Sequence, residues 1–134
     1  MEIKFKEIEV STKEKYQIID LTYEIEEFVK NCGIKNGICL IFAPHATTCF
    51  IANENEENLK EDIITKIKRD FEGKWKHDLI DDNASAHLAS SYLKQFLIFP
   101  VKDGKLIRGT WQNIMLIELD RARKRKVIVE VIGE

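Results

Sequence analysis

The apolar run over residues 38–43 is the feature that most constrains the fold of this chain. It reads Ile-Cys-Leu-Ile-Phe-Ala, with Gly37 before it and Pro44 after it. A short, uninterrupted apolar run with such boundaries is typical of a strand in the middle of a sheet. It is far too short to span a membrane. The run therefore predicts a sheet-based core with this segment as a central strand.

The remaining apolar patterns predict an α+β domain. Residues 21–32, 55–71 and 83–93 show helical spacing, with Asp20, Asn53 paired with Glu56, and Asn83 placed as caps. The N-terminal strand is expected to have a bulge or an irregular middle and to form a hairpin with the next strand. Asp103-Gly104 predicts a tight hairpin turn. The predicted strands are 3–10, 16–19, 38–43, 48–52, 95–101, 105–108, 110–119 and 127–132.

This order of elements fits one domain over residues 1–134, with about three helices and a mixed or antiparallel sheet in a two-layer or sandwich-like arrangement. A net charge of −2 gives no reason to expect nucleic acid or a membrane surface as a partner. Cys32, Cys39 and Cys49 form no CxxC pair, which indicates reduced cysteines that pack in the core. Because residues 1–10 alternate like a strand, we expect no N-terminal signal and a cytoplasmic location.

All three histidines lie in polar, turn-rich segments. They are His45 in Pro-His-Ala-Thr-Thr, His77 in Trp-Lys-His-Asp, and His87 after Asp81-Asp82-Asn83. Three neutral imidazoles with one open position are a common catalytic zinc site, although the spacing matches no short zinc signature. Asp82 could hold a ligand imidazole as an outer partner. The alternatives are surface or capping histidines and acids that merely start a helix.

Two further segments carry candidate chemistry. Glu54 could act as a general acid or base, and Asn53 could hold a substrate oxygen, although helix capping alone explains their composition. Thr110 and Gln112 in Gly-Thr-Trp-Gln, together with Thr47, could place a substrate, whereas strand packing is the alternative. The basic residues of 121–126 could recruit an anionic ligand, or could form a solvated hairpin turn.

In this order, these segments resemble the YjbQ-like family, often labelled secondary thiamine-phosphate synthase enzyme. The resemblance covers about residues 16–133. It implies a small α+β homotrimer and a divalent metal, expected to be zinc, held by His45, His77 and His87. The family label implies weak thiamine-phosphate synthase activity. Ala46-Thr47-Thr48 and Gln112-Asn113 depart from the sequences that relatives often have there.

The sequence therefore supports two hypotheses of different kinds. The first is a metal-dependent enzyme acting on a small phosphorylated or anionic substrate, either a thiamine-phosphate synthase-like transferase or a hydrolase. Its catalytic residues would be Glu54 and Asp82, and Asn53, Thr47, Thr110 and Gln112 would bind the substrate. The second is a non-catalytic trimeric module with a structural metal, which binds a metabolite or a partner. Contact with RNA through residues 121–126 is a weaker third hypothesis.

Overall fold

Eight strands form two antiparallel sheets that pack face to face. The structure is a computed structural model that describes residues 1–134, with no cis peptide bond. The five-stranded sheet has the order β1-β8-β3-β5-β6, and the three-stranded sheet has the order β2-β7-β4. Every pair of neighbouring strands is antiparallel. The strands are β1 (Glu2–Ser11), β2 (Ile18–Asp20), β3 (Gly37–Phe42), β4 (Thr48–Asn53), β5 (Phe96–Lys102), β6 (Lys105–Leu106), β7 (Asn113–Glu118) and β8 (Lys124–Gly133).

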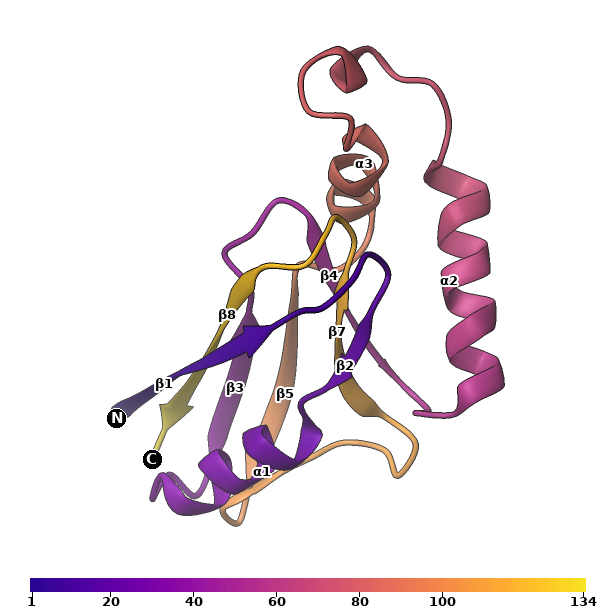
Figure 1. The fold of residues 1–134 in the computed structure, drawn as a ribbon. Helices are drawn as coiled ribbons and strands as arrows, with labels where there is room; N and C mark the ends of the chain where they lie inside the picture. Colours follow the sequence, from indigo (N-terminus) through magenta and orange to yellow (C-terminus); the bar gives the residue numbers. More distant parts are fainter.

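The main core lies between the two sheets. Val127 and Val129 of β8 meet Ile114 and Leu116 of β7 in one buried cluster. Helix α1 (Thr22–Asn31) closes one end of this core, as Figure 1 shows, and contributes Ile25 to it. The expected α+β sandwich with three α-helices is therefore confirmed.

The other two helices cover the outer face of the three-stranded sheet (Figure 1). Ile67 of α2 (Glu57–Phe71) and Ala89 of α3 (Ala84–Tyr92) pack against Cys49 and Ile117 in a second, smaller core. A short 3-10 helix, η1 (Lys76–Leu79), connects them and was not predicted. None of these helices is both long enough and apolar enough to cross a membrane.

The predicted central strand is confirmed as β3, which lies between β8 and β5. Only one face of β3 is buried, because Cys39 and Ile41 point into the core while Ile38 and Phe42 are exposed. Strands β3 and β8 approach so closely at Gly37 that an added Cβ would lie 2.0 Å from the carbonyl oxygen of Ile132. Only glycine fits this close approach.

Two local predictions for the start of the chain are wrong. The first two strands do not form a hairpin, because β1 pairs with β8 and β2 pairs with β7 in the other sheet. Strand β1 also has no bulge, and its pairing with β8 is regular throughout. The apolar residues change phase because Ile3 and Phe5 face outward, whereas Ile8 and Val10 face the core.

The predicted hairpin turn at Asp103-Gly104 is confirmed. Both residues have positive φ, 52° and 76°, which is the geometry of a type I′ turn. Two predicted caps differ from the structure. Glu56 caps α2 by accepting from the backbone N–H groups of Asn58 and Leu59, and Asn83 makes no capping bond at all.

Candidate functional site

A cavity of about 360 Å³ brings two of the three histidines together. His45 follows the end of β3, and His87 lies on α3. The hydroxyl of Ser90 donates to the carbonyl of Thr48 at 2.8 Å, which ties α3 to the start of β4 and places His87, one turn earlier, beside the cavity. The cavity, called here the histidine cavity, is lined by Pro44, His45, Ala46, Thr47, Asp81, Asn83, His87, Asp120, Arg121, Arg123 and Arg125.

The ring of His77 packs edge-on against the ring of His87, with centroids 4.8 Å apart and an angle of 74° between the ring planes. His77 lines a neighbouring cavity of about 630 Å³ that His87 also borders. All three sequence-predicted histidines are therefore at the same end of the molecule. His87 is the residue that both cavities share.

Asn83 and Asp120 determine which nitrogen of His77 carries the proton. The Asn83 amide group donates to a carboxylate oxygen of Asp120 at 3.1 Å, so its carbonyl oxygen faces Nε2 of His77, also at 3.1 Å. Because that oxygen can only accept, Nε2 of His77 must donate and Nδ1 keeps its lone pair in the neutral ring. Asp120 is itself held by Arg123 at 2.9 Å.

His45 is held in a different way. Its Nε2 accepts the backbone N–H of Lys126 at 2.9 Å, so the proton of the neutral ring lies on Nδ1. Burial, followed by the charge of Arg125, lowers the pKa of His45 from its usual value of 6.5. The ring is therefore neutral near pH 7, but neither nitrogen offers a free lone pair in this arrangement.

Within one chain, these contacts do not fit the metal site that the sequence suggests. No group of three or more His, Cys, Asp or Glu side chains is arranged to hold a metal ion. His77 and His87 are paired, while His45 is engaged with Lys126. A three-histidine site would require His45 to turn away from Lys126, or a ligand from another copy of the chain.

Behind the cavity lies a buried ion pair between Glu118 of β7 and Arg125 of β8. Nε of Arg125 donates to Glu118 at 2.7 Å, and a second guanidinium nitrogen donates to the other carboxylate oxygen. The same guanidinium group donates to the hydroxyl of Thr47 at 2.7 Å. Thr12 donates to Glu118 at 2.8 Å, so the pair is fully bonded. Thr47 is thus part of the cavity wall, as a buried residue held by Arg125.

The remaining predicted residues lie at the opposite end of the three-stranded sheet. Asn53 is at the end of β4, and Asn113, its pairing partner, begins β7. A six-residue strand spans about 17 Å, so Asn53 and Glu54 are separated by that length from Thr48 and the histidine end. Thr110 and Gln112 are exposed in the loop before β7, not in a strand as expected, and Figure 1 shows this loop far from α3.

The sequence predicts Asp82 as the residue that holds a histidine ring, but in the structure the next residue, Asn83, bonds to His77. Asp82 is exposed, has a φ of 54° and does not line the histidine cavity. Asn83 and Asp120 take the orienting position instead. Glu118 was missed as the ion-pair partner, although an acid inside the apolar run 114–119 is the signal that could have revealed it.

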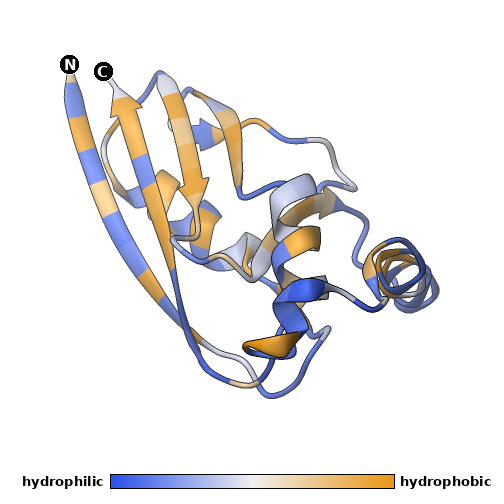
Figure 2. Ribbon diagram, turned by 90° about the horizontal axis from the view of Figure 1, so that it is seen from above, coloured by the Kyte–Doolittle hydropathy of each residue, from blue (hydrophilic) through white to orange (hydrophobic).

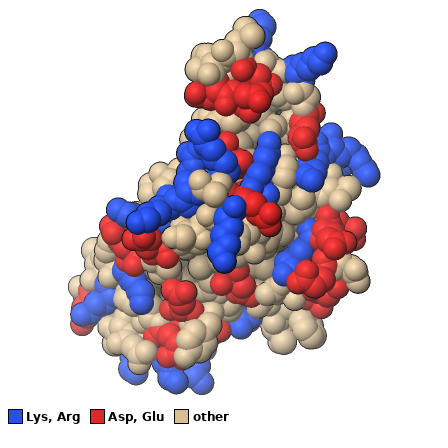
Figure 3. All heavy atoms as spheres, in the orientation of Figure 1, with Lys and Arg blue, Asp and Glu red and all other residues tan.

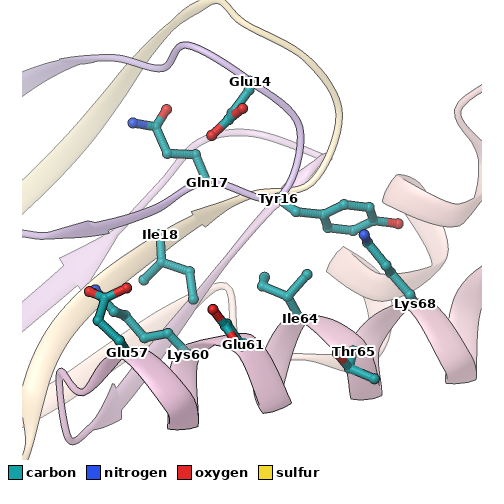
Figure 4. A pocket seen from close by; sticks show the side chains of 10 residues that line it. All are labelled: Glu14, Tyr16, Gln17, Ile18, Glu57, Lys60, Glu61, Ile64, Thr65 and Lys68. Carbon is teal, nitrogen blue, oxygen red and sulfur yellow. The ribbon is translucent and has the colours of Figure 1, made fainter.

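Another cavity, of about 590 Å³, lies between β2 and α2 (Figure 4). It contains none of the predicted site residues. Its charges are mixed, with Glu57 bonded to Lys60 at 2.9 Å and the ring of Tyr16 packed beside Lys68. On the face drawn in Figure 3, basic and acidic side chains are also interspersed, without an extended surface of one sign.

The protein is an α+β sandwich of two packed antiparallel sheets. Helices cover one outer face, and a cavity lined by imidazole and guanidinium groups lies at one end. The chain belongs to the family described as UPF0047 protein YjbQ-like, whose sequence profile matches residues 6–134. Among its relatives is a UPF0047 protein of Archaeoglobus fulgidus, 38% identical over 128 residues, covering 94% of this chain and 99% of the relative.

Solved structures show the same fold. A YbjQ-like protein of unknown function from Sulfolobus solfataricus P2 is 51% identical, with a TM-score of 0.97 over 99% of each chain. A hypothetical protein from Aeropyrum pernix K1 is 36% identical, with a TM-score of 0.94 over 98% of this chain and 99% of its own. The family resemblance seen in the sequence is therefore confirmed.

Proposed function

We propose that this protein is an enzyme that acts on a small phosphorylated or otherwise anionic substrate in the histidine cavity. The observation that supports this most strongly is the lining of the cavity, where two imidazoles and three guanidinium groups meet. Arg125 is neutralised by Glu118, and Arg123 by Asp120. Arg121 has no acidic partner among the ion pairs, and neither has Asp81, which lines the same cavity. Arg121 is the cation proposed to bind the anion.

His87 is the proposed proton-transfer residue, because it borders both cavities. A histidine near neutrality can give or take a proton from a leaving or attacking oxygen. His77, whose tautomer Asn83 controls, would hold the His87 ring in place. Thr47 and Asn83 would contact the substrate, and Arg121 would bind its phosphoryl oxygens.

Thiamine-phosphate synthesis is the specific reaction that the family label suggests. Both of its substrates carry phosphate groups, and its leaving group is pyrophosphate, so a cavity lined by guanidinium groups and other hydrogen-bond donors suits it. Hydrolysis of a phosphate ester would suit the same cavity with water as the nucleophile. The proposal covers both reactions, and turnover of defined substrates distinguishes them.

A homotrimer is the second part of the proposal, and the outer face of the five-stranded sheet supports it. In register, Ile3 of β1 lies opposite Ile132, and Phe42 of β3 lies opposite Phe96. The side chains of Ile3, Phe42 and Phe96 are exposed, and that of Ile132 is partly exposed. Figure 2 shows that hydrophobic residues are frequent along β3 and β8. Contiguous exposed apolar surfaces often mark contacts between proteins. The apolar sheet face comprises Ile3, Phe5, Ile38, Leu40, Phe42, Phe96, Ile98, Ile128 and Ile132.

Assembly would also bear on the distant residues Asn53, Glu54, Thr110 and Gln112. Within one chain, Glu54 cannot reach the histidine cavity across the length of β4. Glu54 would serve as an acid or base there only from a neighbouring copy. A non-catalytic trimeric module is the alternative, and the separation of Glu54 from the histidines favours it only over an active site that uses Glu54 of the same chain.

The test is turnover of a panel of phosphate esters and of the two thiamine-phosphate precursors. We expect His87→Ala to reduce kcat by about 10²–10⁴-fold, as for loss of an acid–base group. Glu54→Gln is the matched control, and it leaves turnover unchanged unless copies share the site. Equal turnover by His87→Ala and the parent protein would exclude the proposed role of His87, and no turnover on any substrate would favour the binding module.

A further inference from the structure

Strand β4 forms an edge of the three-stranded sheet, and part of that edge has no partner. In an antiparallel pair, successive residues direct their backbone groups alternately toward and away from the neighbouring strand. Glu118 of β7 bonds to the β2 side, through Tyr16 and Gln17, so Ile117 faces β4 and pairs with Cys49. It follows that Thr48, Phe50 and Ala52 direct their backbone groups away from β7.

The chain covers only the first part of this edge. The hydroxyl of Ser90 donates to the carbonyl of Thr48. The backbone N–H of Phe50 donates to the carbonyl of Lys94 at 2.7 Å in an isolated antiparallel bridge. The chain then turns into β5. Ala52 has no backbone hydrogen bond on this side, so its N–H and C=O remain available.

A cavity of about 550 Å³ lies along this edge. Four consecutive residues of β4, from Phe50 to Asn53, line it, and α2 forms the opposite wall. Most of the lining is apolar, including Ile63 and Leu93. The cavity is therefore bounded by an unpaired strand edge on one side and an apolar helix face on the other.

Only some of the charged side chains at this cavity have an ion-pair partner. Lys66 is bonded to Asp70 at 3.2 Å, whereas Lys94 has no ion pair. Asp62, also in the lining, lies on α2, the wall opposite β4, and has no ion pair either. Lys94 is thus a free cation beside the unpaired edge.

We propose that this edge binds a short extended peptide with apolar side chains and an acidic residue. The peptide would add a strand beside β4, pairing its backbone with the N–H and C=O of Ala52. Its apolar side chains would contact Ile63 and Leu93, and its carboxylate would pair with Lys94. Exposed edges of this kind are usually blocked in proteins, and here the one-residue bridge at Lys94 leaves the next position open. This site is separate from the histidine cavity and does not depend on the proposed enzyme activity.

The test uses the peptide acetyl-Val-Glu-Val-Glu-Val-amide, titrated into the isotope-labelled protein and followed by NMR. We expect the amide of Ala52 to exchange rapidly with solvent in the free protein and more slowly with peptide bound. A control peptide with N-methylated backbone nitrogens keeps the side chains but cannot pair with a strand. It should bind roughly fivefold or more weakly, the effect of losing one hydrogen bond.

Two protein variants complete the test. Ala52→Pro removes the N–H that faces the edge without affecting the bonds to β7, and proline is tolerated at such positions. It should weaken binding of the peptide, whereas Ala52→Val should not. Lys94→Ala should weaken binding of this peptide but not of a Gln-containing version. If Ala52→Pro does not fold, the N-methylated peptide still decides.

Three outcomes would overturn the proposal. The first is no binding at millimolar peptide. The second is equal binding of the N-methylated and parent peptides, which would mean that only side chains are recognised. The third is protection of the Ala52 amide that increases with protein concentration in the absence of peptide, which would assign the edge to a second copy of the chain.

Discussion

Glu118 and Arg125 form a bidentate ion pair that joins the two sheets through the core. The side chains are 0% and 2% exposed. Removing one partner from a buried pair leaves an uncompensated charge, which typically costs 3–5 kcal/mol. We therefore expect Arg125→Met to lower the free energy of unfolding by about 3–5 kcal/mol, measured by urea denaturation.

The control is the double variant Glu118→Leu with Arg125→Met. Replacing both charges with apolar groups is often neutral for stability, so the double variant should recover most of the loss. Thr12 and Thr47 would still lose partners, so full recovery is not expected. Additive losses in the double variant would show that the pair itself contributes little.

The tautomer of His77 is the second prediction. Nitrogen NMR of the ring should show a protonated Nε2 and an unprotonated Nδ1, because Asp120 fixes the orientation of the Asn83 amide. Asp120→Leu should release that amide and produce a mixture of tautomers. Lys74→Leu, a change in the same region outside this network, serves as the control. A parent protein that already shows mixed tautomers would contradict the prediction.

Metal content is the third prediction, and it follows from the family resemblance. If assembly of copies completes the three-histidine site, the purified protein should contain about one zinc per chain, by mass spectrometry. The double variant His45→Ala with His87→Ala should retain none. Because one chain does not assemble three donors, a monomeric variant should also lose the metal. A parent protein that stays free of metal after incubation with zinc would reject the three-histidine site.

The fourth prediction concerns the apolar sheet face. Ile98 of β5 is 54% exposed on this face, so Ile98→Glu should convert the proposed trimer into monomers, as measured by light scattering. Tyr23→Glu is a matched control, since Tyr23 is an exposed side chain on α1, outside the face. A monomeric parent protein would reject the proposed trimer, and a trimer that survives the Ile98→Glu change would place its contacts elsewhere.

The fifth prediction concerns alkaline pH. Burial, and then the charge of Glu72, raise the pKa of Tyr16 from 10.0 to about 12. The folded protein therefore keeps the Tyr16 proton between these values, while the unfolded chain loses it, so stability should fall as pH rises from 10 to about 12. Tyr16→Phe should flatten this dependence. Ionisation of all three tyrosines together near pH 10, seen by ultraviolet absorbance, would contradict it.

The sequence allowed most strands and helices to be predicted, because apolar spacing is a local signal. It did not allow the partners of those strands to be predicted. Strands β1 and β2 are neighbours in sequence, yet each pairs with a strand near the other end of the chain. Which sheet a strand joins depends on contacts across the whole domain, and spacing carries no information on that.

The candidate site could likewise be predicted only in part from the sequence. The three histidines could be grouped by their residue types, and they do lie at one end of the molecule. Glu54 and Gln112 were assigned to the same site because they are also polar and near strand ends. The direction of β4, which carries Asn53 away from Thr48, separates them, and only the fold reveals that direction.

The apolar side chains of β1 face outward in its first half and toward the core in its second half. This arrangement affects how the protein should respond to dilution. Its second half is anchored by Ile8 and Val10 in the core, while Ile3 and Phe5 have nothing to pack against in an isolated chain. If copies separate, the first residues of β1 should fray while the rest of the strand stays paired. The rate of amide hydrogen exchange near the N-terminus would then report on assembly, because exchange should be fast in dilute solution and slow in concentrated solution.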